Sequence, residues 1–250
     1  MSENLSQKEL ENLRIAGRKL AEIFEMLKRE TKPGVSEKQL DDLVGKAIKD
    51  KGAIATYRTP EVNFPGNICI STNDVIVHGI PSARILQTGD VVSFDLVIEY
   101  GGMKADSAFT MVVGEQPTGA KKVLLNTTER SLYAGIKAIR GAVMTGTIGA
   151  AVEKVLDSEK LGVVRDLVGH GVGRLMHEDP DVPNYGRKGT GDLVPVGASI
   201  AIEPMTTLGT WKIKQDNDGW TIRTRDGSLS AHFEHTVVIT ECGAEIITKL

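Results

Sequence analysis

An aspartate stands in the middle of an apolar segment of this chain. Residues 91–98 read Val-Val-Ser-Phe-Asp-Leu-Val-Ile, so apolar side chains occupy both faces of the strand that the segment predicts. A strand of that kind is buried on both sides, and an ionised carboxylate inside it is costly unless it is paired or bound to a metal ion. A loop cap or an arginine partner is the alternative. Because the segment contains no basic residue, we expect Asp95 to bind a cation.

A tight turn brings a second aspartate close to the first. The Gly-Gly pair at 101–102 separates two strand-like runs. If these glycines are the two central residues of the turn, Asp95 faces Ala108, and Asp106 is its diagonal neighbour on the same face of the hairpin. A three-residue loop would place the two carboxylates on opposite faces. Two carboxylates aimed at one point repel each other unless a cation or a shared proton lies between them.

Two glutamates and a histidine extend this pattern. Glu203 follows Ser-Ile-Ala-Ile, and Glu234 precedes His-Thr-Val-Val-Ile. His170 lies in Gly-His-Gly-Val-Gly, where the glycines exclude a helix and permit a close approach of the backbone to a ligand. Taken alone, His170 fits a structural role as well as a ligand. The chain has only five histidines, and all lie in or beside these segments: His78, His170, His177, His232 and His235. At least one of the two that flank Glu234 is expected outside the ligand set.

Charge balance favours a pair of divalent cations. Four carboxylates carry a charge that two divalent ions neutralise, and four oxygen donors with one imidazole suit Mn, Fe, Co or Zn. Two such ions can activate a water molecule near neutral pH. The sequence does not distinguish among these metals.

Composition and charge argue against nucleic-acid binding, a cysteine-based framework and a membrane span. The net charge of −3 gives no electrostatic basis for nucleic-acid binding. Cys69 and Cys242 are far apart and fit neither a disulfide framework nor a zinc-ribbon spacing. No window approaches 18 uninterrupted apolar residues and no leader pattern opens the chain, so we expect a cytoplasmic protein without a membrane span.

The order of elements predicts an α+β fold. Amphipathic helices are expected over residues 10–27, 36–52, 124–139 and 147–156. Strands are expected over residues 67–71, 75–78, 91–100, 103–113, 198–205, 220–225, 232–240 and 245–249. Helices, strands, helices and strands in succession favour helices packed on one face of antiparallel sheet, in two halves of similar layout.

These residues, in this order, resemble the methionine aminopeptidases of the short bacterial type, class I, over about Leu10 to Thr248. The resemblance rests on five motifs: Val77-His78-Gly79-Ile80-Pro81, Phe94-Asp95 with Asp106, Gly169-His170-Gly171-Val172-Gly173-Arg174 with His177-Glu178-Asp179-Pro180, Ile202-Glu203-Pro204-Met205, and Phe233-Glu234-His235-Thr236. It implies a pita-bread fold in one catalytic domain, residues 1–250, with pseudo-symmetric halves of roughly 1–115 and 116–250 around a cleft that holds two metal ions.

The resemblance also assigns roles to individual residues. The implied metal ligands are Asp95, Asp106, His170, Glu203 and Glu234, with Asp106 and Glu234 bridging. Glu203 would also move a proton of the attacking water, while His78 and His177 would contact the scissile amide and stabilise the tetrahedral intermediate. The methionine pocket would draw on Phe64, Cys69 and Trp220, and backbone carbonyls of Asn73, Val75 and Ser230 would form a monovalent-cation site.

Three positions depart from the family pattern. Lys104-Ala105-Asp106-Ser107 stands where many members have His-Gly-Asp-Thr. Met176 occupies a pocket position that is usually aromatic, and a thioether can still pack there. His232 stands where a glutamine is common. These changes affect the surroundings of the ligands and leave the ligands themselves in place.

The implied reaction is removal of an N-terminal methionine from nascent proteins and peptides when the second residue is small, by a monomer that makes at most a transient ribosome contact. Ser2 is small, so Met1 of this chain is itself a candidate substrate. One alternative is an X-Pro aminopeptidase or prolidase, although such chains usually carry an additional N-terminal domain. Another is a binding protein that kept the fold and lost catalysis, although no ligand is missing here.

Overall fold

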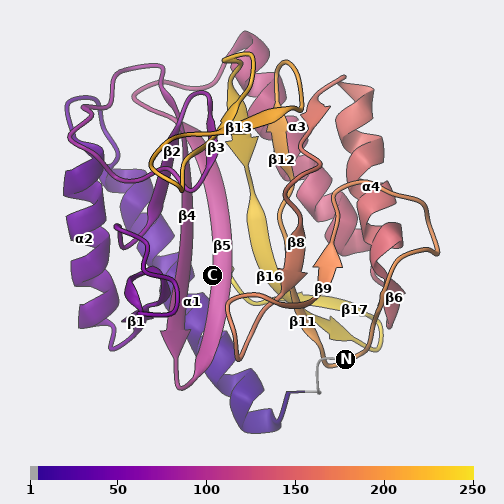
Figure 1. Cartoon of the computed structure of the whole chain (residues 1–250). Helices are drawn as coiled ribbons and strands as arrows, with labels where there is room; N and C mark the ends of the chain where they lie inside the picture. The colour runs from indigo at the N-terminus through magenta and orange to yellow at the C-terminus, as the bar shows by residue number, and fades with distance from the viewer. Residues whose placement is uncertain (1–4) are drawn as a thin grey trace.

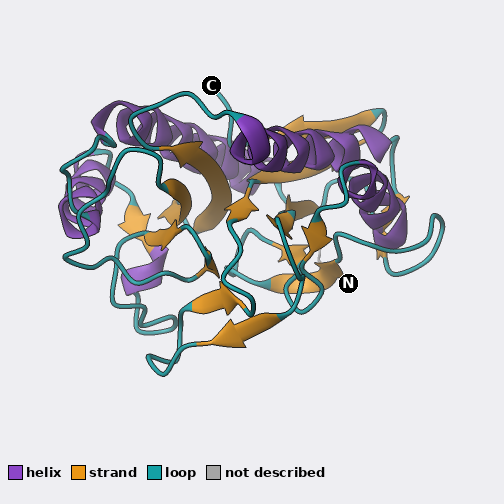
Figure 2. Ribbon diagram, turned by 90° about the horizontal axis from the view of Figure 1, so that it is seen from above, coloured by secondary structure: helices purple, strands orange, loops and turns teal. Residues whose placement is uncertain are grey.

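The chain folds into helices that cover one face of a curled sheet, as a computed structural model of residues 5–250 shows. The helices are α1 (Gln7–Glu30), α2 (Glu37–Asp50), α3 (Gly119–Ala138), α4 (Thr145–Ser158) and the short 3-10 helix η1 (Thr56–Arg58). Seen from above, the long helices lie on one side and the strands and loops on the other (Figure 2). The expectation for Met1 and Ser2 lies outside the described residues.

Nine strands form the main sheet, in the order β1-β4-β5-β16-β11-β8-β9, with β2 also paired to β4 and β17 to β16. Their bounds are β1 (Ile54–Ala55), β2 (Cys69–Thr72), β4 (Val91–Tyr100), β5 (Met103–Val112), β8 (Gly169–Gly171), β9 (Glu178–Val182), β11 (Ser199–Ile202), β16 (Glu234–Thr240) and β17 (Gly243–Ile246). Figure 1 shows β4, β5 and β16 side by side at the centre. The sheet therefore joins strands from both ends of the chain.

Three small sheets complete the fold. They are β10 (Leu193–Val194) with β6 (Val143–Met144); β15 (Ser230–His232), β12 (Met205–Thr207) and β7 (Gly162–Val163); and β13 (Ile213–Gln215), β14 (Ile222–Thr224) and β3 (Val75–Val77). The strands expected over 91–100 and 103–113 are confirmed, because β4 and β5 span 91–100 and 103–112. No helix among residues 5–250 is long and apolar enough to cross a membrane.

The hairpin register agrees with the sequence prediction. Asp95 pairs with Ala108, and Val97 pairs with Asp106. The two turn glycines, Gly101 and Gly102, have φ of 59° and 81°, a region that glycine adopts at low cost. A two-residue turn therefore keeps both aspartates on the same face of the hairpin.

Two segments that were each predicted to form one continuous strand are each divided between two strands. The segment 198–205 divides into β11 and β12 at Glu203-Pro204, and the segment 232–240 divides into β15 and β16 at Phe233. Proline lacks the N–H that a strand ladder needs. The two breaks lie opposite each other in the paired segments. Ile202 pairs with His235 in the main sheet, and Met205 pairs with His232 in a small sheet. We expected Glu203 inside a strand, and that prediction is wrong: Glu203 directly follows β11, which ends at Ile202.

Local signals explain most helix boundaries. Ser36 caps α2 through a capping box with Gln39, as the Ser-x-x-Gln pattern predicts. Ser6 and Glu9 form the same arrangement at the start of α1. The third helix begins earlier than predicted, at Gly119, because its first turn is exposed and carries no apolar periodicity that sequence reasoning could detect. The main core lies between these helices and the sheet.

Candidate active site and metal centre

The five predicted ligands converge on the face of the main sheet that the helices leave uncovered. Adjacent strands contribute them: Asp95 from β4, Asp106 from β5, Glu234 from β16, Glu203 from the end of β11 and His170 from β8. All five line one cleft of about 930 Å³. The strand order β4-β5-β16-β11-β8 therefore places side chains that are distant in sequence side by side.

The donor atoms approach one another as ligands of shared cations do. Donor atoms of Asp106, His170 and Glu234 all lie within 4.8 Å of one another. His170 Nε2 is 3.9 Å from Asp106 Oδ2 and 3.4 Å from Glu203 Oε1. Asp106 Oδ1 and Glu234 Oε1 are buried and have no hydrogen-bond partner among the described residues. Buried oxygens of that kind are expensive unless something binds them.

Burial makes this cluster unfavourable as four free carboxylates. It raises the pKa of Asp95 to about 7, although the hydrogen bond from Tyr57 lowers that pKa in part. Burial, reinforced by the charge of neighbouring carboxylates, raises the pKa of Asp106, Glu203 and Glu234 well above their ordinary values. Protons or cations must therefore neutralise the cluster. The oxygen-rich donor set with one imidazole fits divalent metal ions.

His170 is oriented by its own backbone neighbour. Its Nδ1 is 2.9 Å from the Gly171 carbonyl oxygen, so Nδ1 carries the hydrogen and Nε2 presents its lone pair to the carboxylates. Burial lowers the pKa of His170 to about 4, which keeps the ring neutral at pH 7. A neutral imidazole is the form that binds metal.

Tyr57 belongs to the site and was not predicted. Its hydroxyl donates a 2.7 Å hydrogen bond to Asp95 Oδ1, and both groups are buried. Tyr57 comes from η1, almost forty residues before Asp95. No local sequence pattern connects these two positions, so only the folded structure reveals the contact.

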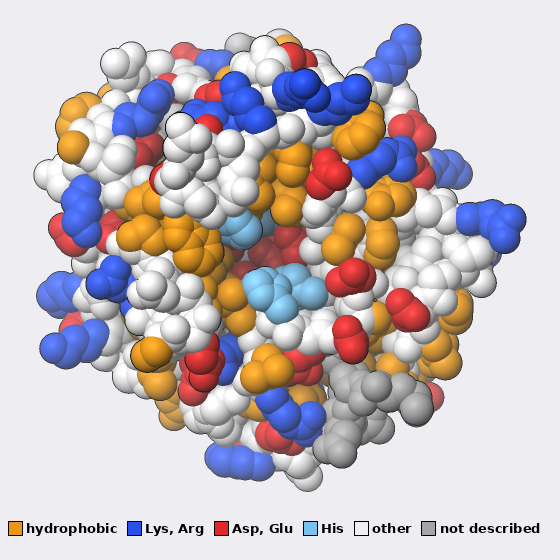
Figure 3. All heavy atoms as spheres, viewed as in Figure 1, with side chains coloured by type: hydrophobic (Ala, Val, Ile, Leu, Met, Phe, Trp, Pro, Cys, Tyr) orange, Lys and Arg blue, Asp and Glu red, His pale blue; other side chains and the backbone are white. Residues whose placement is uncertain are grey.

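Two further histidines stand at the cleft. Figure 3 shows histidine side chains flanking a hollow whose floor is acidic, and both His78 and His177 line it. The rings of His170 and His177 meet edge to face, with centroids 4.4 Å apart. Burial, with the charge of His177 as a smaller cause, lowers the pKa of His78 to about 4, and burial lowers the pKa of His177. Both rings are therefore neutral at pH 7 and can donate one N–H each.

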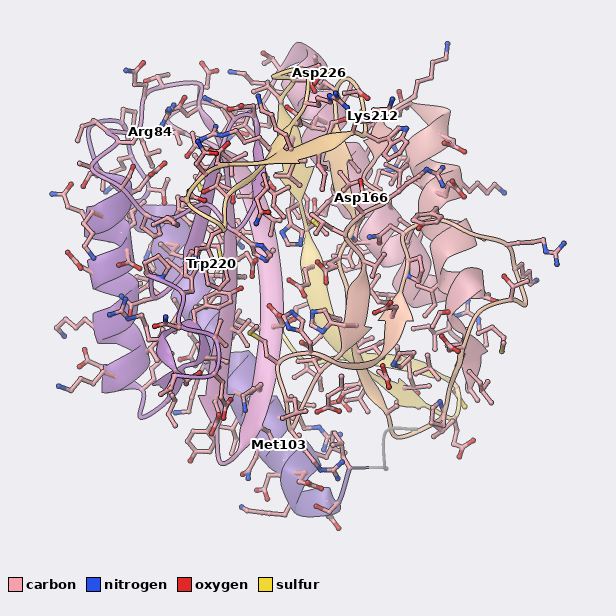
Figure 4. The ribbon with its side chains drawn as sticks, in the orientation of Figure 1. Arg84, Met103, Asp166, Lys212, Trp220 and Asp226 are labelled. Atoms are coloured by element: carbon pink, nitrogen blue, oxygen red, sulfur yellow. The ribbon has the colours of Figure 1, made fainter. Side chains whose placement is uncertain are left out.

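The three residues predicted for a methionine pocket lie together beside Asp95. Phe64 and Cys69 form a small apolar cluster against which Trp220 and Met176 pack. Phe64 and Trp220 meet edge to face at 5.3 Å between centroids, and Cys69 pairs directly with Asp95 across the sheet. Trp220, labelled in Figure 4, lies on the β4 side of the molecule. Phe64 and Cys69 are buried within this cluster, and Met176 is the member of the set that also lines the cleft.

The predicted monovalent-cation residues also meet. Ser230 Oγ is 3.1 Å from the carbonyl oxygen of Asn73 and 2.8 Å from that of Val75. Asn73 has a φ of 61°, in the left-handed region that asparagine tolerates better than most residues. The Ser230 hydroxyl therefore donates to the carbonyl oxygens of Asn73 and Val75, two of the three carbonyls that were predicted to bind the cation.

The cleft contains other side chains to which the sequence analysis gave no role. They are Leu167, Val168, Arg174, Leu175, Glu178, Asp179 and Asp181, in the segment around His170 and His177. The first four lie in the loops before and after β8, and the three acidic residues belong to β9. Asn184 lies outside the cleft and contacts the backbone of a predicted ligand: its side chain donates a 3.0 Å hydrogen bond to the carbonyl of Glu203.

A cleft with buried carboxylates and histidines that fit divalent ions is the site of a metallohydrolase. Comparison with known proteins agrees: residues 11–241 match metallopeptidase family M24, and the chain belongs to that family. The methionine aminopeptidase of Mycoplasma capricolum is 41% identical over 98% of this chain and 97% of its own. Methionine aminopeptidase 1 of Bacillus subtilis is 42% identical over 97% of each chain.

The fold comparison gives the same family. The crystal structure of a methionine aminopeptidase from Thermotoga maritima covers the whole of both chains with a TM-score of 0.96 and 37% identity. The α+β architecture is therefore the pita-bread fold that the sequence motifs implied.

Proposed function

We propose that this chain is a methionine aminopeptidase, which hydrolyses the peptide bond after an N-terminal methionine when the second residue is small. The observation that carries the proposal is the convergence of Asp95, Asp106, His170, Glu203 and Glu234 on one cleft. Relatives about 40% identical over nearly the whole chain bear the name of that activity.

The five convergent side chains would hold two divalent ions, with Asp106 and Glu234 shared between them. Cobalt, manganese, iron and zinc all suit such donors. When bound, the ions polarise the scissile carbonyl and lower the pKa of the attacking water. The buried, unpartnered oxygens of Asp106 and Glu234 support this assignment.

The protein's own groups would complete the reaction. Glu203 takes a proton from the attacking water and delivers it to the leaving amine, since a carboxylate with a raised pKa can hold that proton near neutral pH. The N–H groups of His78 and His177 donate to the scissile amide and to the oxyanion of the tetrahedral intermediate. Both rings are neutral and line the same cleft.

An apolar pocket beside the centre would select methionine. Phe64, Cys69 and Trp220, which pack together, would form its apolar wall, against which a polarisable thioether packs well. Met176 packs against the same cluster, so it can replace the aromatic side chain common in the family. The backbone carbonyls of Asn73, Val75 and Ser230 would take a monovalent cation, with the Ser230 hydroxyl turning away from the two carbonyls to which it donates.

The proposal has further parts: the substrates, the location and partners, and the division into halves. Substrates are nascent chains and peptides with an N-terminal methionine, and the enzyme acts as a cytoplasmic monomer with a transient ribosome contact. Residues 1–250 form one catalytic domain, and its halves, roughly 1–115 and 116–250, share a layout. The order of two long helices before a central strand pair supports the division, because α1 and α2 precede β4 and β5 as α3 and α4 precede β11 and β16.

Peptide hydrolysis tests the proposal. Protein stripped of metal and reloaded separately with Mn, Fe, Co or Zn under reducing conditions is given Met-Ala-Ser, Met-Leu-Ser and Ala-Pro-Ser. We expect methionine release from Met-Ala-Ser, far less from Met-Leu-Ser, and no cleavage of Ala-Pro-Ser. Cleavage of Ala-Pro-Ser alone would identify an X-Pro peptidase. Metal binding without release from any peptide would identify a binding protein.

A further inference from the structure

His232 is a buried imidazole that the proposed reaction does not use. It ends β15, is 1% exposed, and has no hydrogen-bond partner at either ring nitrogen among the described residues. A buried polar atom without a partner costs about 1–3 kcal/mol. Two such atoms on one ring need an explanation.

The ring faces the metal-binding carboxylates. His232 Nε2 lies 3.7 Å from Glu203 Oε2 and 3.9 Å from Glu234 Oε2. These distances are too long for hydrogen bonds. Two atoms that share one cation, each at the usual bond length of about 2.0–2.2 Å, lie roughly 3–4 Å apart. The His232 distances fall in that range.

His170 shows the same pattern on the other side of Glu203. Its Nε2 is 3.4 Å from Glu203 Oε1, whereas His232 Nε2 faces Oε2 of the same carboxylate. The two imidazoles therefore bracket Glu203. The distances from His232 Nε2 to its two carboxylates, 3.7 and 3.9 Å, are close to those from His170 Nε2 to its two, 3.4 and 3.9 Å.

We propose that His232 is a second imidazole ligand of the metal centre, bound through Nε2 to the ion that Glu203 and Glu234 hold. The inference rests on the proposed metal site. Binding would place the hydrogen on Nδ1 and leave one unpartnered N–H in place of two unpaired nitrogens. A metal-bound imidazole is neutral and donates the lone pair of one ring nitrogen to the ion.

A second imidazole changes which metal the centre prefers. Imidazole favours Zn, Fe and Co, whereas carboxylate and amide oxygens suit Mn. His232→Gln exchanges the nitrogen for an amide oxygen of similar reach. We expect this variant to bind Zn and Co at least about tenfold more weakly, with an unchanged affinity for Mn.

The experiment measures metal binding in the full-length protein, without reference to activity. Competition with a chromophoric chelator gives the affinities of wild type and His232→Gln for Zn, Co and Mn, and visible absorption of the Co form reports the donor atoms. His235→Gln is the matched control, because His235 hydrogen-bonds with Tyr133 and Thr248, away from the cleft. The control should keep the wild-type affinities, and thermal unfolding checks that both variants fold.

The outcomes separate the two proposals. Weaker Zn and Co binding with a Co absorption band shifted to longer wavelength, in His232→Gln only, supports the inference. Wild-type affinities and an unchanged Co spectrum in a folded His232→Gln overturn it while leaving the metal site intact. Failure of the wild-type protein to bind any of the three ions would overturn the proposed function itself.

Discussion

Replacing Lys104 by methionine tests whether its ammonium group holds in place the loop that carries Arg174 and His177. Lys104 is 7% exposed, and its Nζ lies 3.0 Å from Glu99 Oε2 and donates a 3.0 Å hydrogen bond to the carbonyl of Arg174. It stands at the start of β5, beside Met103, which marks the turn end of the hairpin in Figure 4. Arg174 lies in the loop that carries His177. Methionine keeps most of the apolar stem and removes the ammonium group.

The structure sets the size of the effect. Removing one partner of a fully buried ion pair costs about 3–5 kcal/mol. The Glu99 side chain is 20% exposed and can turn toward water, which lowers the expected loss. We therefore expect Lys104→Met to reduce the free energy of unfolding by about 2–3 kcal/mol, and the melting temperature by about 4–12 °C for a chain of this size.

Thermal and urea unfolding measure this loss. Lys46→Met is the matched control, because Lys46 pairs with Asp50 at the surface, with side chains 73% and 58% exposed. That control should change stability by less than about 1 kcal/mol. Peptide hydrolysis should also fall more for Lys104→Met than for Lys46→Met, since a looser loop positions His177 less well. Equal stability of the two variants would refute the argument.

Three further changes have defined outcomes. Tyr57→Phe removes the hydrogen bond to Asp95, so divalent-metal affinity should fall about 10- to 100-fold; an unchanged affinity in chelator competition would contradict the role of Tyr57. Adding Mn at about 100 times its Kd should stabilise the metal-free protein by about 2.7 kcal/mol, and calorimetry that shows no rise in melting temperature would count against a buried metal site. Gly17→Ala places a Cβ 2.3 Å from the carbonyl oxygen of Ile247, so urea unfolding should show a loss of about 1–3 kcal/mol where alanine ordinarily stabilises a helix.

The sequence predicts those parts of the site that depend on local geometry. A two-residue glycine turn fixes the register of β4 and β5, so the shared face of Asp95 and Asp106 follows from the turn alone. The burial of both aspartates follows from the apolar residues around them. Neither inference needs knowledge of the distant strands.

The sequence does not predict the parts that depend on contacts between distant segments. Glu203 and Glu234 lie where two chain segments leave the main sheet together and enter a small one, and the pairing of Met205 with His232 locates that change. Apolar residues stand on both sides of each break, so periodicity predicts two continuous strands, and Pro204 is the one local signal against it. Tyr57 reaches Asp95 from a 3-10 helix for which no local pattern gives a signal.

Side chains other than the ligands hold the ligand strands together. The Thr236 hydroxyl accepts a 2.9 Å hydrogen bond from the Asp106 N–H and donates a 2.7 Å one to the Asp106 carbonyl. The Ser107 hydroxyl donates a 2.6 Å bond to the carbonyl of Glu234. These hydroxyls join β5 to β16 at the centre of the site through the backbone. Because the strands are fixed in this way, repulsion among the carboxylates cannot easily separate them, and their oxygens remain directed at one point where cations can bind.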